Sequence, residues 1–136
     1  KKIALCTTSN KNFAEHVLKF LLGDIHFDVI LAGDVVSKKK PDPEIYNMAL
    51  ERLAIDPQEA LVVEDSMIGV EAAHVAGIKV LATTNVYTEK EDLSKATIIV
   101  DCLGDEEHKV RITKPSEYEM FGQFVRFEDV EKYLSK

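Results

Sequence analysis

Short apolar runs alternate along the chain with longer segments in which apolar residues recur at helical spacing. Strands are expected at five short apolar runs, residues 3–5, 27–32, 61–63, 79–83 and 96–100. Helices are expected where the spacing is helical, at about residues 11–22, 43–54 and 66–75. This alternation predicts an α/β fold with a parallel sheet and flanking helices, in which the loops after the strands share one rim.

The pattern is weakest in the C-terminal part of the chain. It predicts a short edge strand over 110–112, a loop around Pro115, a short strand over 124–127 and a closing helix over 128–134. These elements leave residues 106–136 without a definite place in the fold. The 136 residues contain no internal repeat and no clear domain boundary, which is consistent with one domain that has a real core.

The composition is typical of a soluble globular protein in a reducing compartment. Hydrophobic residues make up 46% of the chain, and no apolar run approaches the length needed to span a bilayer. The 24 acidic residues outnumber the 17 basic ones, and the net charge of −7 argues against a nucleic acid or an anionic membrane as partner. Cys6 and Cys102 each lie beside a predicted strand, so buried free thiols are expected rather than a disulfide framework.

Two adjacent carboxylates, Glu64 and Asp65, follow directly after the strand expected over 61–63. Ligands of open α/β sheets bind outside the carboxyl ends of the strands, so the pair lies where chemistry is expected. Crowded carboxylates repel each other, and Mg²⁺, which needs only one or two carboxylates beside water and phosphate, would relieve that repulsion. The alternative is an ordinary polar turn in which Ser66 caps the following helix. Spacing alone favours neither interpretation.

A hydroxyl-rich loop, Thr7-Thr8-Ser9-Asn10, joins the first expected strand to the first helix. The free N–H groups and the dipole at a helix N-terminus favour an anion such as phosphate. Taken alone, plain N-capping is the better explanation of these residues. The phosphate interpretation therefore depends on what else lies at the same rim.

Three consecutive lysines, residues 38–40, are followed by Pro41 and Pro43. Proline fixes φ and restricts the residue before it, so this segment is expected to form a stiff loop. Asp42 is expected to be the N-cap of the next helix and Pro43 its first residue. Of the three ammonium groups, we expect that of Lys40 to be held rigidly enough to neutralise a phosphoryl group.

The predicted rim therefore collects a hydroxyl, an ammonium and two carboxylates, from Thr7, Lys40, Glu64 and Asp65. A phosphoryl-transfer site that uses Mg²⁺ needs an anchor for the phosphate, a positive charge and metal ligands. The four histidines share no metal-ligand spacing. Together these features predict a phosphoryl site more strongly than any of them does alone.

In this order the motifs resemble those of the haloacid dehalogenase superfamily of phosphotransferases. The strand that leads to Thr7 is similar to the family's second motif, and Lys40 in Lys-Pro-Asp-Pro to its third. Glu64-Asp65 in Val-Val-Glu-Asp-Ser-Met-Ile-Gly is similar to the fourth. The Lys-Pro-x-Pro and Glu-Asp-Ser-x-x-Gly pair is specific to the branch that includes β-phosphoglucomutase and phosphoglycolate phosphatase.

Two segments, residues 32–43 and 101–105, are similar to the CbbY proteins of photosynthetic organisms, which remove a phosphate from xylulose 1,5-bisphosphate. The resemblance covers about residues 1–105. It implies that residues 1–136 are the C-terminal part of one Rossmann-like core domain. In the family an Asp-x-Asp strand lies at the centre of the sheet, before the second motif, and this chain contains no such strand. We therefore expect that strand and the helical cap to belong to an upstream part of the same protein. We also expect this chain to have two unpaired strand edges where the central strand is missing.

The resemblance also implies a two-step phosphoryl transfer. An upstream aspartate would attack phosphorus, and a second aspartate would serve as acid and base. The Thr7 hydroxyl, the Thr8 amide and the Asn10 side chain would hold the phosphoryl oxygens, and the family pattern implies that Lys40 would bridge phosphate and nucleophile. Asp65 would bind Mg²⁺, and Glu64 would bind the metal or orient its waters.

The expected function is thus that of a Mg²⁺-dependent phosphatase of a phosphorylated sugar, for example xylulose 1,5-bisphosphate. A phosphomutase similar to β-phosphoglucomutase is the nearest alternative, and a non-catalytic phosphate-binding module is the alternative if the protein begins at Lys1. A phosphoacceptor receiver domain is disfavoured, because its acidic residues come first and its lysine last. The resemblance suggests a chloroplast, and the composition is equally compatible with the cytoplasm.

Overall fold

The computed structural model describes residues 1–23, 25–114 and 122–135. Its elements in chain order are β1 (Ala4–Cys6), α1 (Lys11–Leu22), β2 (Val29–Leu31), α2 (Glu44–Leu53), a short 3₁₀ turn (Pro57–Glu59), β3 (Leu61–Glu64), α3 (Met67–Val75), β4 (Lys79–Thr83), β5 (Ile98–Val100), β6 (Ile112–Lys114) and α4 (Phe127–Leu134). The α/β alternation expected from the sequence is confirmed. No helix within these described ranges is long and apolar enough to cross a bilayer.

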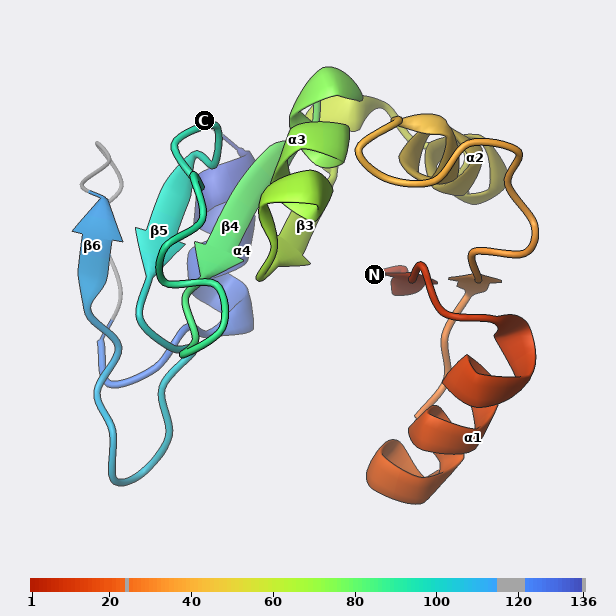
Figure 1. Cartoon of the computed structure of the whole chain (residues 1–136). Coiled ribbons are helices and arrows are strands. Elements are labelled where there is room, and N and C mark those ends of the chain that lie inside the picture. The colour runs from red at the N-terminus through yellow and green to blue at the C-terminus, as the bar shows by residue number, and fades with distance from the viewer. Residues whose placement is uncertain (24, 115–121, 136) are drawn as a thin grey trace.

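The strands form two separate sheets (Figure 1). β1 and β2 pair in parallel, with Ala4 opposite Val29 and Cys6 opposite Leu31. The second sheet has the order β3-β4-β5-β6, in which β6 runs antiparallel to β5 and the other pairs are parallel. The expected parallel sheet with flanking helices is confirmed for β1 to β5, and its division follows from the absence of the central strand. One correction is needed, because the last strand, which follows β5 without a helical crossover, returns antiparallel.

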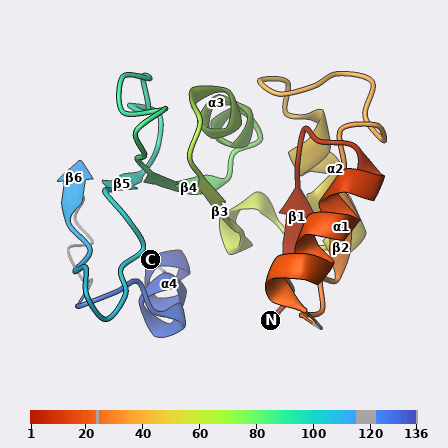
Figure 2. The ribbon, with the colours of Figure 1, turned by 60° about the horizontal axis from the view of Figure 1, so that its bottom comes forward.

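Two strand edges face the gap between the sheets (Figure 2). β1 pairs only with β2, and β3 pairs only with β4, within the part of the chain that the structure describes. An unpaired edge presents a row of backbone N–H and C=O groups that another strand can satisfy. The structure thus has the two open edges that were expected for a chain without the family's central strand.

Helices, rather than strand pairing, hold the two sheets together. α2 packs on β1 and β2, whereas α3 packs on β3 and β4 and contacts α2. One buried cluster runs through these elements and includes Leu31, Ile45, Val70 and Val80. Burying an aliphatic side chain of this size stabilises a fold by about 1.5–3 kcal/mol, so the shared cluster fixes the relative placement of the sheets.

The other face of the larger sheet carries a second, smaller cluster. Leu81, Ile98, Val100 and Val110 are buried there. Alternation along β4 directs Val80 and Leu81 to opposite faces, which is why one strand serves both clusters. α4 lies on this second face, opposite α3 (Figure 2).

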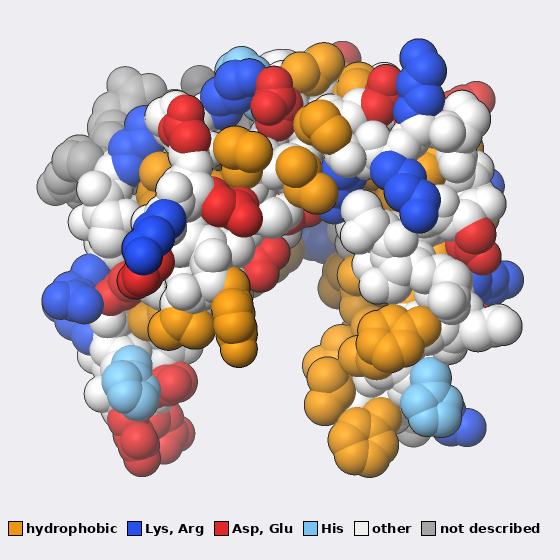
Figure 3. Space-filling view, viewed as in Figure 1, with side chains coloured by type: hydrophobic (Ala, Val, Ile, Leu, Met, Phe, Trp, Pro, Cys, Tyr) orange, Lys and Arg blue, Asp and Glu red, His pale blue; other side chains and the backbone are white. Residues whose placement is uncertain are grey.

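α1 has the helical spacing that the sequence predicted, yet most of its apolar side chains face solvent. Ala14 is its one buried residue, whereas Phe13 and Phe20 are 58% and 84% exposed. Figure 3 shows the apolar side chains of α1 at the lower right. They lie beside a hollow between the part of the molecule with α1, β1 and β2 and the part with the larger sheet. The periodicity therefore predicted the helix correctly but not its burial.

The start of α2 differs from the sequence prediction by one residue. Pro43 is the N-cap rather than the first helical residue, and α2 begins at Glu44. Asp42 still supports this end, because its Oδ1 accepts the N–H of Glu44 at 3.0 Å. Asp42 therefore still binds a free N–H group at the start of α2, but it does so from the turn that precedes the N-cap.

The C-terminal predictions need larger corrections. The strand expected over 124–127 is wrong, because no strand forms there and Phe127 begins α4. Val125 donates a single backbone hydrogen bond to Leu103 at 2.8 Å, which attaches the segment without forming a ladder. The edge strand lies at Ile112–Lys114 rather than at 110–112. The loop expected around Pro115 lies outside the described residues.

Candidate active site

Three loops meet around an open pocket of about 440 Å³, those after β1 and β3 and the one before α2. Its wall consists of Leu5, Cys6, Thr7, Thr8, Lys40, Val63, Glu64, Asp65, Ser66, Ile68 and Thr83. Of the residues nominated from the sequence, this wall brings together Thr7, Thr8, Lys40, Glu64 and Asp65. Asn10 is not part of it, because its Oδ1 accepts the Phe13 N–H at 2.9 Å and caps α1.

Lys40 is the buried member of the three consecutive lysines. Its side chain is 5% exposed. Lys38 is 73% exposed and forms an ion pair with Asp42 at 3.8 Å. The stiff loop before α2 therefore turns one ammonium inward and leaves another in solvent.

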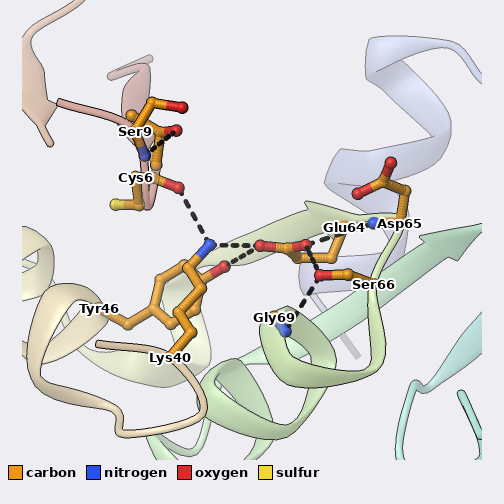
Figure 4. A network of polar contacts seen from close by, with 9 residues as sticks. Cys6, Ser9, Lys40, Tyr46, Glu64, Asp65, Ser66 and Gly69 are labelled. Atoms are coloured by element: carbon orange, nitrogen blue, oxygen red, sulfur yellow. Dashed lines mark hydrogen bonds and ion pairs between the residues drawn. The ribbon is translucent and has the colours of Figure 1, made fainter. Parts of the chain in front are cut away.

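The ammonium of Lys40 connects two strands that do not pair with each other (Figure 4). Its Nζ donates to the backbone oxygen of Cys6, at the end of β1, at 3.0 Å. The same Nζ lies 2.5 Å from Oε1 of Glu64, at the end of β3. It also lies 4.7 Å from the centre of the Tyr46 ring, close enough for a cation–π contact. This one group thus closes the rim across the gap between the sheets.

The carboxylate of Glu64 accepts hydrogen bonds from four donors. Lys40 and the Tyr46 hydroxyl, the latter at 2.6 Å, contact Oε1. The backbone N–H of Asp65 and the Ser66 hydroxyl contact Oε2 at 3.3 and 3.2 Å. Burial raises the pKa of Glu64, but the Lys40 charge and these hydrogen bonds outweigh burial and hold the pKa below its usual range. Glu64 is therefore an anion whose acceptor positions are filled by the protein.

Tyr46 and Gly69 support the position of the Glu64 carboxylate. Burial, together with the charge of Glu64, raises the pKa of Tyr46, so its hydroxyl stays protonated and donates. Gly69, in the first turn of α3, leaves room for the carboxylate, since a Cβ there would lie 2.1 Å from Cδ of Glu64. Any larger residue at this position would displace the carboxylate from its donors.

Asp65 differs from its neighbour in being exposed on the pocket wall. Its Oδ2 accepts a hydrogen bond from Nδ2 of Asn85 at 3.2 Å. Asn85 is itself fixed, because its Oδ1 accepts the backbone N–H groups of Tyr87 and Thr88 at 2.8 and 3.1 Å. Figure 4 shows the Asp65 carboxylate pointing away from that of Glu64. The two adjacent acids thus have different environments and different possible roles.

The contacts of Glu64 and Asp65 indicate which of the two carboxylates could bind Mg²⁺. The ion takes oxygen ligands and needs only one or two protein carboxylates beside waters and phosphate. Asp65 meets that requirement, whereas both oxygens of Glu64 already accept hydrogen bonds. Within the described residues, no group of three or more His, Cys, Asp or Glu side chains could hold a metal ion. Asp65 can therefore supply one ligand of a magnesium site, and further oxygen ligands would complete that site.

The hydroxyl-rich loop lies across the pocket from the acidic pair. Thr7 continues the pairing of β1 by donating its N–H to Leu31 at 3.0 Å, and its Oγ1 accepts the Ser9 N–H at 3.2 Å. Gly33 donates its N–H to Ser9 at 2.8 Å, and a Cβ at Gly33 would lie 2.3 Å from the backbone oxygen of Thr8. The loop after β2 thus supports this loop through a close approach that only glycine permits.

Both cysteines are free and half-buried, as free thiols were expected to be near strands. Burial raises the pKa of the Cys6 thiol to about 11, although the nearby Lys40 ammonium acts in the opposite direction. The thiol that lines the pocket is therefore neutral and unreactive at neutral pH.

Sequence reasoning missed Tyr46 and Asn85. The helical spacing of apolar residues predicts which face of the helix is buried. It does not predict that the Tyr46 hydroxyl donates to Glu64. The position of Tyr46 in the first turn of the helix that follows Lys40 was the available signal. Asn85 lies in a polar connection after β4, and only the parallel pairing of β3 and β4 brings it to Asp65.

Comparisons with known proteins place this site in a family. Residues 1–83 match the model of the haloacid dehalogenase-like hydrolases. An Arabidopsis thaliana CBBY-like protein is 47% identical over 106 residues, which is 76% of this chain and 33% of that protein. A phosphorylated carbohydrates phosphatase of Thermotoga maritima is 47% identical over 78 residues, 57% of this chain and 36% of that protein. The chain belongs to the haloacid dehalogenase-like hydrolase family.

Solved structures agree with this assignment. The crystal structure of CbbY from Rhodobacter sphaeroides in complex with phosphate has a TM-score of 0.69 and 35% identity, and the match covers 74% of this chain and 46% of that one. A structure of a mutant of the same bacterial protein contains xylulose-(1,5)bisphosphate, with the same score. The chain thus spans from a third to less than half of the length of these relatives.

Proposed function

We propose that this chain is part of a Mg²⁺-dependent phosphatase that removes a phosphate from a phosphorylated sugar through an aspartyl-phosphate intermediate. The observation that carries the proposal is the rim itself. Buried Lys40, fixed by Glu64, lies in one pocket with exposed Asp65 and with the loop of Thr7 and Thr8. The names of the relatives support a sugar phosphate as substrate, and we nominate xylulose 1,5-bisphosphate.

Each group at the rim has a role in this proposal. The Thr7 hydroxyl and the Thr8 amide bind phosphoryl oxygens, and Lys40 neutralises the charge that develops between phosphate and nucleophile. Asp65 holds Mg²⁺, which shields phosphate charge when bound. Glu64 holds Lys40 in place through their ion pair.

The nucleophilic aspartate belongs, in this proposal, to a part of the same protein that precedes residue 1. Residues 1–136 are then the C-terminal part of one core domain. The open edges of β1 and β3 support this view, because a strand between them would satisfy both rows of backbone groups. We further propose a reducing compartment, the chloroplast or the cytoplasm, since the plant relative and the two free cysteines are compatible with either.

The test uses the full-length gene product and measures inorganic phosphate released from a panel of phosphorylated sugars, with Mg²⁺ or with a chelator. Lys40→Met and Asp65→Asn are each expected to lower turnover by roughly a hundredfold or more, because each removes a charge that stabilises the transition state. Lys38→Met is the matched control, since that lysine is 73% exposed, and it should behave like the wild type.

Three outcomes would count against the proposal. Equal effects of the Lys40 and Lys38 variants would show that the rim is not the active site. Conversion of the substrate to an isomeric sugar phosphate, without phosphate release, would establish a phosphomutase instead. Binding of phosphate by the wild type without turnover of any sugar phosphate would establish a non-catalytic module.

A further inference from the structure

We infer that Tyr46 is a positioning residue of this site. It holds the Lys40–Glu64 ion pair in place, so that Asp65 is the carboxylate that binds the cation. This inference rests on the proposed function and assigns a role within the same site. Tyr46 comes from α2, an element that contributes no side chain to the pocket wall. It therefore adds a second layer behind the residues that line the pocket.

Tyr46 contacts both members of the ion pair at once. Its hydroxyl donates to Oε1 of Glu64 at 2.6 Å, and its ring lies 4.7 Å from Nζ of Lys40. The side chain is buried, with the residue only 4% exposed, so water does not compete for these contacts. Figure 4 shows the hydroxyl and the ammonium reaching the same carboxylate oxygen from α2 and from the loop before it. The ring and the hydroxyl thus fix two opposite charges relative to each other.

The contacts of Glu64 explain why this matters for the cation. A carboxylate has about four acceptor positions, and four donors already contact those of Glu64. Gly69 packs directly behind the carboxylate, which limits rotation in that direction. Asp65 lies outside this cage and is exposed to the pocket. Removing the Tyr46 hydroxyl frees a position on Oε1 and allows Glu64 to turn toward a cation.

The test compares Tyr46→Phe with Tyr87→Phe in the full-length gene product. Phe keeps the ring and its cation–π contact but removes the donated hydrogen bond, whereas Tyr87 is 90% exposed and serves as the matched control. Tyr46→Phe is expected to lower kcat by roughly tenfold, the loss expected for one hydrogen bond to a charged group, with little change in KM. Calorimetric titration with Mg²⁺ alone is expected to give binding several-fold tighter than in the wild type.

A double-mutant cycle separates positioning from simple structural support. If the hydroxyl acts through Glu64, then Tyr46→Phe should have no further effect on kcat or on Mg²⁺ binding in a Glu64→Gln background. Additive effects in the two backgrounds would overturn the inference. Unchanged kcat and unchanged Mg²⁺ binding in a folded Tyr46→Phe protein, with folding checked by its thermal midpoint, would overturn it as well.

Failure of this inference can be distinguished from failure of the proposed function. If no sugar phosphate is hydrolysed by the wild type, the proposed function fails, while the Mg²⁺ titrations of the wild type and Tyr46→Phe still test the cation part of the inference. If the wild type is active and Asp65→Asn is not, but Tyr46→Phe matches the wild type in both measurements, only the inference fails.

Discussion

At the scale of single residues, the main finding is that two adjacent acids, Glu64 and Asp65, have separate environments. One is caged by four donors and tied to Lys40, and the other is exposed and held by an amide. The sequence shows only two acids in a row after a strand. Their division of labour comes from Tyr46 and Asn85, which reach them from other elements.

Asn85 provides a prediction at this scale. Asn85→Ala removes the Nδ2 donor that orients the Asp65 carboxylate, so the Mg²⁺ concentration for half-maximal activity should rise several-fold while the fold persists. The measurement is a Mg²⁺ titration of phosphate release by the full-length protein. Asn47→Ala, at an exposed position on α2, is the control. Identical titrations for both variants would mean that Asp65 needs no amide to orient it.

At the scale of elements, α3 combines two functions in its first turn. Ser66 accepts the Gly69 N–H at 3.3 Å as the N-cap and donates to Oε2 of Glu64 at 3.2 Å. The start of the helix therefore depends on the same groups as the site. The Ser-Met-Ile-Gly segment that begins the helix is also part of the carboxylate's cage.

Gly69→Ala tests this coupling. Alanine is the better helix former, so helix propensity alone predicts a more stable protein by about 1 kcal/mol. The Cβ would however lie 2.1 Å from Cδ of Glu64, and we expect a net destabilisation of roughly 1–3 kcal/mol from overpacking, together with a loss of turnover. Urea unfolding and phosphate release are the measurements, with Gly122→Ala as control because nothing lies within 4 Å of a Cβ there. A stabilised, fully active Gly69→Ala protein would contradict the described packing.

The elements also show what could be predicted from sequence and what could not. Strands such as Leu61–Glu64 and helices such as Lys11–Leu22 have local signals, and these predictions are confirmed. The division of the sheet has no local signal, and it was expected only because the family resemblance implied that the central strand is missing between β1 and β3. The N-cap of α2 was misplaced by one residue, since Asp42 and Pro43 both suit a helix start and only the backbone geometry decides between them.

The site was predictable to a similar degree. Lys40 was chosen over Lys38 because of the two prolines, and the structure does bury Lys40 and expose Lys38. The roles assigned to the rim residues remain predictions until activity is measured. Tyr46 was not predicted because a tyrosine at a buried helical position is usually explained by packing alone.

At the scale of the whole molecule, the ion pair of Lys40 and Glu64 links pH to stability. The folded-state pKa of Glu64 is lowered from 4.5, so its contribution to stability is fully present above pH 4.5 and is lost as the pH falls through the folded-state value. Urea unfolding from pH 7 to pH 3 should show this loss in the wild type, with a slope of up to about 1.4 kcal/mol per pH unit from this group.

Glu64→Gln isolates the contribution of this carboxyl from that of the others. The variant has no carboxyl at this position, so its stability should fall less steeply with acid than that of the wild type, even if it starts lower because Lys40 has lost its partner. Parallel acid limbs for the two proteins would show that other carboxylates determine the acid sensitivity.

Lys40 contacts both Cys6, at the end of β1, and Glu64, at the end of β3. The ammonium group proposed to act in catalysis therefore also links the two sheets. Replacing a buried ion pair by apolar residues of similar volume is often neutral or even stabilising. A Lys40→Met, Glu64→Leu protein could therefore tolerate heat better than the native one while being unable to turn over substrate. Selection for thermostability alone would favour such a change, so robustness and activity are in direct competition at this pair of side chains.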